Sequence, residues 1–181
     1  MKNLRFLLPS LALAALTATG CILISAQVLV SYNLPTPLNI TSPDAVVGAS
    51  VDLNTVGDYK DNKGKLKDVS DLALLGVFTN TGTGAVDVEV WITPTETNYT
   101  LDTDVKAHGI LVWGPLKLAS AEARKVTWDG SAKLFSKAGK NALIGEVKGD
   151  GKFTLYALGG TAPYSFKLEH GVLVAVLDAG K

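Results

Sequence analysis

Apolar and polar residues alternate along several short segments of the chain. The segment AVDVEVWI (residues 85–92) has apolar residues at its even positions and Asp87, Glu89 and Trp91 at the odd ones. The segment YSFKLEH (residues 164–170) repeats the pattern, with Phe166 and Leu168 on the apolar face. Because successive side chains of a strand point to opposite faces, this alternation predicts β-strands with one buried face.

Two further runs are apolar at nearly every position, LALLGVF (residues 72–78) and VLVAVL (residues 172–177). Such runs are typical of strands covered on both faces, so we expect them at the centre of a sheet. The run VLVSY (residues 28–32) is rich in β-branched and aromatic residues, and it predicts another strand near the N-terminus.

Turn-forming residues separate these runs. TNTGTG (residues 79–84) predicts a hairpin loop, and KGDGK (residues 148–152) predicts a second one between the expected strands LIGEV and FTLYAL. His170 and Gly171 predict a third tight reversal. The polar segment at residues 58–68 is expected to be a solvated loop or hairpin, and the proline-rich segment at residues 33–45 an extended surface segment.

One segment has the signals of a helix, WDGSAKLFSKAGK (residues 128–140). Asp129 can cap its start, Leu134 and Phe135 supply an apolar side, and Gly139 can end it. We expect a short helix that crosses from one sheet to another.

Together these elements predict an all-β fold, an antiparallel β-sandwich of about 8–10 strands with one short crossover helix. The stretches LALLGVFTNTGTGAVDVEVWI and LKLASAEARKVTW resemble immunoglobulin-like β-sandwich modules of the cell envelope, in which an NTG hairpin precedes an outward strand. The resemblance implies the fold and indicates nothing about activity.

The N-terminus has the organisation of a secretory signal peptide. Lys2 and Arg5 precede an apolar run that starts at Phe6, and small residues gather before Cys21, which is the one cysteine of the chain. We therefore expect residues 1–20 to be a signal peptide and residues 21–181 to form a single domain.

The residues Ala18-Thr19-Gly20-Cys21 resemble the lipobox of bacterial lipoproteins. In that family, signal peptidase II cleaves before a cysteine whose sulfur carries diacylglycerol. The resemblance implies cleavage between Gly20 and Cys21 and lipidation of Cys21; it departs from the family at Ala18, where leucine is usual. Ile22 takes the place of the aspartate that retains some lipoproteins in the inner membrane, which favours the outer membrane.

Two other interpretations of the N-terminus remain open. Ordinary signal peptidase could cut the same bond and leave the Cys21 thiol free. Alternatively, residues 6–30 could be an uncleaved anchor helix, because residues 6–43 contain no charged side chain and about twenty apolar residues span a bilayer. All three interpretations place the body of the protein outside the cytoplasm.

The charge of the chain excludes one class of partner. Without residues 1–20, 15 basic residues remain against 17 acidic ones, a net charge of −2. No clustered basic patch accompanies this mild charge, so we expect no nucleic-acid partner. With a single cysteine no internal disulfide can form, and the fold must depend on its hydrophobic core.

Candidate catalytic and metal-binding residues are few. His108 and His170 stand beside glycines and are expected to be exposed turn residues. Ser131 and Lys133 could suggest a Ser-Lys dyad, but both are expected to be solvated at a helix start, where the lysine would keep its proton. The acids around Gly64 do not have the spacing of a calcium loop. We expect no cofactor, no metal and no enzyme activity.

The three tryptophans are the remaining candidates for a binding site. Trp91 lies on the polar face of its expected strand, where it would be an exposed ligand anchor if that face is open, or a packing residue if the face is covered. Trp113 and Trp128 are expected to belong to the core.

The sequence thus predicts a non-enzymatic cell-envelope lipoprotein. Its domain would be tethered to a membrane by lipid on Cys21 and would act as a structural or protein-interaction module with an unidentified envelope protein. The alternative is a surface module that binds glycans or peptides through Trp91.

Overall fold

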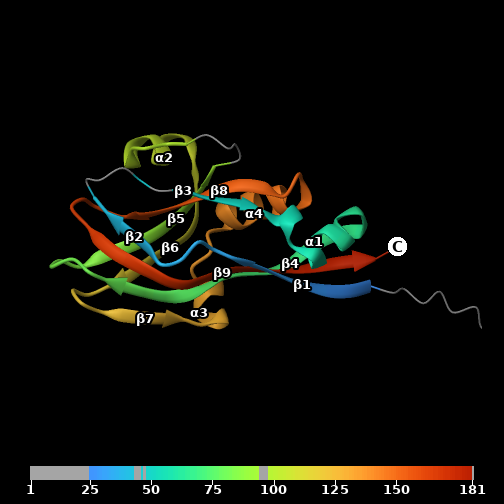
Figure 1. Ribbon diagram of the computed structural model, residues 1–181, viewed down its shortest axis with the longest axis horizontal. Helices are drawn as coiled ribbons and strands as arrows, with labels where there is room; N and C mark the ends of the chain where they lie inside the picture. The colour runs from blue at the N-terminus through green and yellow to red at the C-terminus, as the bar shows by residue number, and fades with distance from the viewer. Residues whose placement is uncertain (1–24, 43–45, 47, 94–97, 181) are drawn as a thin grey trace, which may run out of the picture.

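The computed structural model describes residues 25–42, 46, 48–93 and 98–180. Strands hold 53% of them and helices 24%, so the fold is mostly β, as the alternation predicted. The strands form two antiparallel sheets (Figure 1).

The first sheet has β9 (Ser165–Gly180) and β4 (Leu66–Asn80) at its centre. On one side, β9 pairs with β1 (Ser25–Asn33) and, further along, with β2 (Leu38–Thr41). On the other side, β4 pairs with the short edge strand β7 (Ala123–Val126). The two central strands contain the runs that are apolar on both faces, which confirms their expected place.

The second sheet has the strand order β3 (Gly48–Asp52), β8 (Lys152–Gly159), β5 (Val86–Thr93) and β6 (Ile110–Leu118). The alternation predicted for β5 is confirmed, because Val86, Val88, Val90 and Ile92 are all buried. Side chains from both sheets meet in one hydrophobic core, which includes Leu74, Phe78 and Leu168 of the first sheet and Val90 and Leu155 of the second.

The described residues also contain four α-helices, not the one short helix expected. α1 (Gly57–Asn62) precedes β4, and α2 (Asp102–His108) lies on the second sheet, at the top of Figure 1. α3 (Trp128–Ala132) and α4 (Lys137–Lys148) follow β7. Two 3-10 turns, Leu53–Thr55 and Lys63–Lys65, flank α1.

The expected strand at residues 143–147 is part of helix α4, so that prediction was wrong. Leu143 and Val147 are buried in the core, one helical turn apart, and α4 contacts β4 of the first sheet as well as β5, β6 and β8 of the second. Residues 148–152 therefore connect a helix to a strand, not two strands.

The expected hairpin at residues 79–84 is not a hairpin, because β4 and β5 belong to different sheets. The buried Asn80 side chain fixes this crossing: its amide donates to the carbonyls of Gly84, Leu118 and Ala119. The feature that carried the resemblance to immunoglobulin-like modules is thus a connection between sheets.

The expected reversal at His170 and Gly171 is a β-bulge inside β9. These two residues lie opposite the single residue Gly76 of β4, since the pairing steps from Leu75–Val172 to Val77–Glu169. His170 has a φ of 53° and is exposed. A bulge and a tight turn favour the same residue types, which is why the local sequence suggested a turn.

Two expected loops are also more ordered than predicted. The polar segment at residues 58–68 forms α1, a 3-10 turn and the start of β4, and it is held by the fully buried Tyr59, whose hydroxyl donates to the Val147 carbonyl at 2.7 Å. Within residues 33–45, Leu38–Thr41 pairs with β9 as β2.

Candidate functional site

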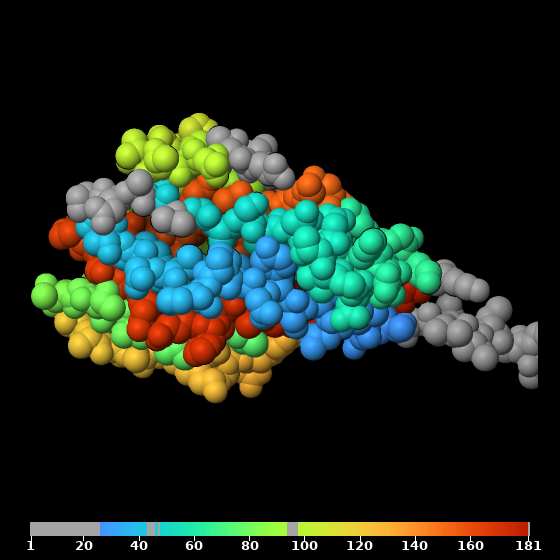
Figure 2. All heavy atoms as spheres, viewed as in Figure 1, coloured from blue at the N-terminus to red at the C-terminus, as the bar shows by residue number. Residues whose placement is uncertain are grey.

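Gly20 and Cys21, the predicted cleavage and lipidation site, lie outside the described residues. The first described residue, Ser25, pairs with Gly180 near the end of the chain. The two ends of the described part of the chain therefore lie at the same end of the molecule, beside α1 (Figure 1), and Figure 2 shows the first described residues bordering the α1 segment there.

The structure limits the anchor-helix interpretation. Residues 25–30 of the segment in question belong to β1, so they are not helical. Within the described ranges, no helix is long and apolar enough to cross a membrane.

Trp91 lies on the outward face of the second sheet and is partly buried. It packs with Tyr99 against a small cluster formed by Val46, Val105, Tyr156 and Leu158, beneath helix α2. Its indole N–H donates to Glu89 Oε2 at 3.1 Å. Trp91 thus helps to pack α2 onto the sheet while part of its ring stays accessible.

Trp113 is a core residue, as expected, and Trp128 is not. Trp113 is fully buried and stacks on Phe78 with ring centroids 5.3 Å apart. Trp128 is partly exposed at the start of α3, and its indole N–H donates to Asp71 Oδ2 at 2.9 Å.

Ser131 was expected to be solvated and is fully buried. Its Oγ accepts the backbone N–H of Leu74 at 2.8 Å, and the Trp113 indole N–H lies 3.1 Å from both Ser131 Oγ and the Ser131 carbonyl. β7 pairs with residues 76–79 of β4, so Leu74 lies outside the paired stretch. The Ser131 hydroxyl gives the Leu74 N–H the acceptor that a neighbouring strand would otherwise provide.

His108 ends helix α2 and is exposed, as expected. Its Nδ1 lies 2.9 Å from the Asp104 carbonyl, and its ring stacks on Tyr99 with centroids 5.2 Å apart. In the segment at residues 58–68, Asn62 donates to the Asp58 carbonyl, and Lys63 Nζ donates to the Asp150 carbonyl at 2.7 Å. No three His, Cys, Asp or Glu side chains come together as metal ligands within the part of the chain that the structure describes.

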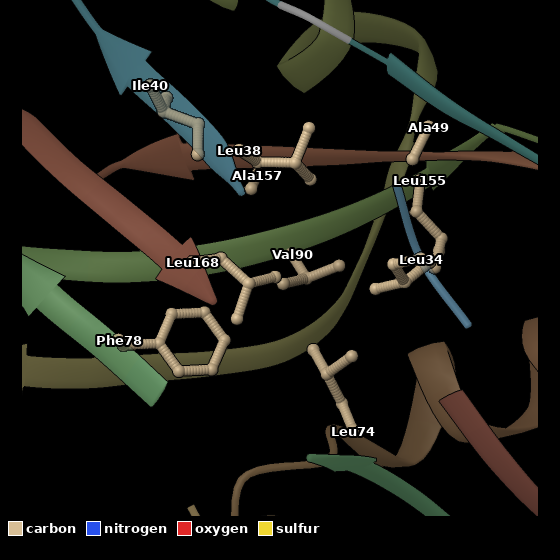
Figure 3. Close-up of a pocket in the computed structure, with 10 residues that line it drawn as sticks. All are labelled: Leu34, Leu38, Ile40, Ala49, Leu74, Phe78, Val90, Leu155, Ala157 and Leu168. Atoms are coloured by element: carbon tan, nitrogen blue, oxygen red, sulfur yellow. The ribbon is translucent and has the colours of Figure 1, made fainter. Parts of the chain in front are cut away.

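A small cavity lies in the core, where side chains of the two sheets meet. Figure 3 shows the small apolar cavity there, lined by residues such as Leu74, Val90, Leu155 and Leu168. Its volume is about 20 Å³. A gap of this size with no polar partner stays dry, so it is a packing defect of the core.

A polar pocket of about 180 Å³ lies at the end of the molecule where β9 begins. Thr41, Asn80, Tyr164 and Ser165 line it. The buried Tyr164 hydroxyl donates to Asp102 Oδ2 at 2.6 Å; burial, reinforced by that carboxylate, raises the pKa of Tyr164. Thr41 Oγ1 lies 3.2 Å from Ser165 Oγ, which joins β2 to β9, and the bond from Tyr164 to Asp102 joins the start of β9 to α2.

A larger pocket of about 410 Å³ lies on the outward face of the first sheet, at the bulge. Leu75 and Val77 form its floor, and Lys125, Trp128 and His170 stand around it. Sequence reasoning missed this pocket, because it depends on the pairing of β4 with β7 and β9. The one sequence signal for an apolar site on this outward face was the run at residues 172–177, which is apolar on both faces.

Comparison of the chain with models of protein families, with curated proteins and with solved structures finds no match.

Proposed function

We propose that the chain is a non-enzymatic cell-envelope lipoprotein. In this proposal its two sheets form a β-sandwich, Cys21 carries the lipid that tethers it to a membrane, with the outer membrane favoured, and the domain is a structural or protein-interaction module of the envelope.

The observation that carries the proposal is the sequence Ala18-Thr19-Gly20-Cys21 so close to the first strand. A basic start and an apolar run precede it, as lipoprotein signals require. β1 begins at Ser25, four residues after Cys21, so an extended chain would allow at most about 14 Å between the two α-carbons. Lipid on Cys21 would hold the end of the molecule formed by β1 and α1 next to the bilayer.

Lipidation is energetically sufficient for stable attachment. Each buried methylene contributes about 0.8 kcal/mol, and one acyl chain alone binds only reversibly. The lipobox resemblance implies two ester-linked chains and an N-acyl chain, which together give lasting attachment.

The test is metabolic labelling in a bacterial host. Radiolabelled palmitate should enter the wild-type protein and not Cys21→Ser, which keeps the size and polarity of the side chain but lacks the thiol. The matched control is Ala18→Leu, which restores the residue usual in the lipobox and should label at least as strongly as the wild type.

Intact-mass analysis of membrane-extracted protein separates the three interpretations of the N-terminus. Acylated Cys21 as the first residue supports the proposal. A free thiol at that position would indicate ordinary signal peptidase, and retention of residues 1–20 would indicate an anchor helix; either mass contradicts the proposal.

A further inference from the structure

The outward face of the first sheet carries an apolar strip where solvent-facing residues should be polar. Leu74 and Leu173 are paired and belong to the core, so their neighbours point away from it. These neighbours are the directly opposed pairs Leu75–Val172, which is partly exposed, and Ala73–Val174, which is buried. An antiparallel sheet with one solvated face normally has polar residues there.

The strip continues to the edge of the sheet that leads to the N-terminus. Val176 pairs with Leu29 of β1, and the Leu29 side chain is 56% exposed. The other half of the same face is polar, because Lys167 and Glu169 point outward there and form an ion pair at 3.0 Å. The apolar character is therefore confined to one half of the face.

The pocket of about 410 Å³ lies where the apolar strip meets this polar half. Lys125 of β7 is opposite Val77, so it projects from the same outward face. His170, the extra residue of the bulge, stands on the other side of the pocket, and the Trp128 indole closes one wall. The site is mostly apolar with a few polar groups, as small-molecule pockets usually are.

The charges around the pocket favour an anion. Lys125 has no carboxylate partner within the described ranges. Two nearby acids are already engaged: Glu169 pairs with Lys167, and Asp71 accepts the Trp128 indole N–H and lies 3.9 Å from Lys140 Nζ. An ammonium and an imidazole at one end of an apolar strip complement a ligand with an anionic head and an apolar body.

We propose that this pocket binds a free aliphatic carboxylic acid. The carboxylate accepts hydrogen bonds from Lys125 and His170, and the chain lies on the apolar floor of the pocket formed by Leu75 and Val77. The proposal is independent of lipid on Cys21, because every residue it uses lies within the folded domain.

The test is photo-crosslinking of the full chain, purified as its host processes it and held in phosphatidylcholine nanodiscs. The probe is decanoic acid with a diazirine in its chain, and peptide mapping by mass spectrometry locates the label. We expect label on residues 75–77 and 125–128, which line the pocket, and excess decanoate should remove it. The matching decanol probe, which lacks the carboxylate, should label these residues about tenfold less.

Lys125→Met keeps the aliphatic stem and removes the charge, and it should lower the labelling about tenfold. Its matched control is Lys117→Met, at an exposed lysine of β6, which should label like the wild type. Equal labelling by the acid and the alcohol, equal labelling of the two methionine variants, or label spread over the whole surface would each overturn the proposal. None of these results bears on Cys21, so the two proposals fail separately.

Discussion

At the scale of single residues, Ser131 has a structural role that its sequence context conceals. Its Oγ accepts the Leu74 N–H in a fully buried position, so Ser131→Ala leaves that donor without an acceptor. An unsatisfied buried donor costs about 1–3 kcal/mol, and we expect the free energy of unfolding to fall by that amount. Urea titration followed by tryptophan fluorescence measures it.

The control for Ser131 is Ser120→Ala in the turn between β6 and β7. Ser120 is exposed and its hydroxyl donates to the Gly82 carbonyl at the surface, so the expected change is within about 0.5 kcal/mol. Equal losses in the two variants would show that the buried hydrogen bond is not what stabilises this region.

At the scale of elements, substitutions at two glycines of α4 test helix propensity and packing separately. A Cβ on Gly139 would lie 2.2 Å from the Val112 α-carbon and 2.4 Å from the Leu111 carbonyl oxygen, both backbone atoms of β6. Gly145, in the same helix, has no neighbour within 4 Å of the equivalent point. Gly139→Ala must therefore push α4 away from the sheet, whereas Gly145→Ala meets open space.

We expect Gly139→Ala to lower the free energy of unfolding by more than about 2 kcal/mol. Gly145→Ala should raise it by about 0.5–1 kcal/mol, because alanine is the better helix former and restricts the unfolded chain. Thermal unfolding followed by circular dichroism compares the two. A stabilising effect of both changes would contradict the close packing of α4 on β6.

The strands could be predicted from the sequence because alternation is a local property. Strand pairing is not a local property. The turn residues at 79–84 are equally compatible with a hairpin and with a crossing between sheets. Contacts such as the bonds of Asn80 to Leu118 and Ala119 distinguish the two, and these contacts need the fold. In α4, the spacing of Gly139, Leu143 and Val147 by four residues was a helix signal that the apolar pair at 143–144 obscured.

The candidate site was less predictable than the fold. Trp91 was the candidate for a ligand-binding residue, with a packing role as the alternative, yet the larger pocket lies on the other sheet beside Trp128, a residue that was expected to be core. Which face a side chain occupies follows from register, and the bulge at His170 changes that register in the middle of β9. Cys21 stays a prediction of the sequence alone.

At the scale of the whole molecule, two buried tyrosines should make the free energy of unfolding fall at alkaline pH. Tyr59 packs α1 against α4, and Tyr164 joins β9 to α2 at the opposite end of the fold. Burial is the main cause that raises the pKa of each; Asp150 and Asp52 add to it for Tyr59, and the hydrogen bond to Asp102 adds to it for Tyr164. Ionising either side chain would therefore place an uncompensated negative charge inside the protein.

The sign of the pH effect follows from these raised pKa values. Below pH 10, the ordinary tyrosine pKa, both phenols keep their protons in the folded and unfolded chains, and the stability is fully present. Above it the unfolded chain loses protons that the folded one holds, so the free energy of unfolding falls by at most about 1.4 kcal/mol per pH unit for each tyrosine.

Urea titrations between pH 8 and pH 11 should show this decline, with tyrosinate absorbance rising only as the protein unfolds. The Tyr59→Phe and Tyr164→Phe double variant should lose most of the slope, because lysine titration is common to both proteins and cancels in the difference. Identical slopes in the two proteins would mean that these phenols ionise as freely in the folded state as in the unfolded chain.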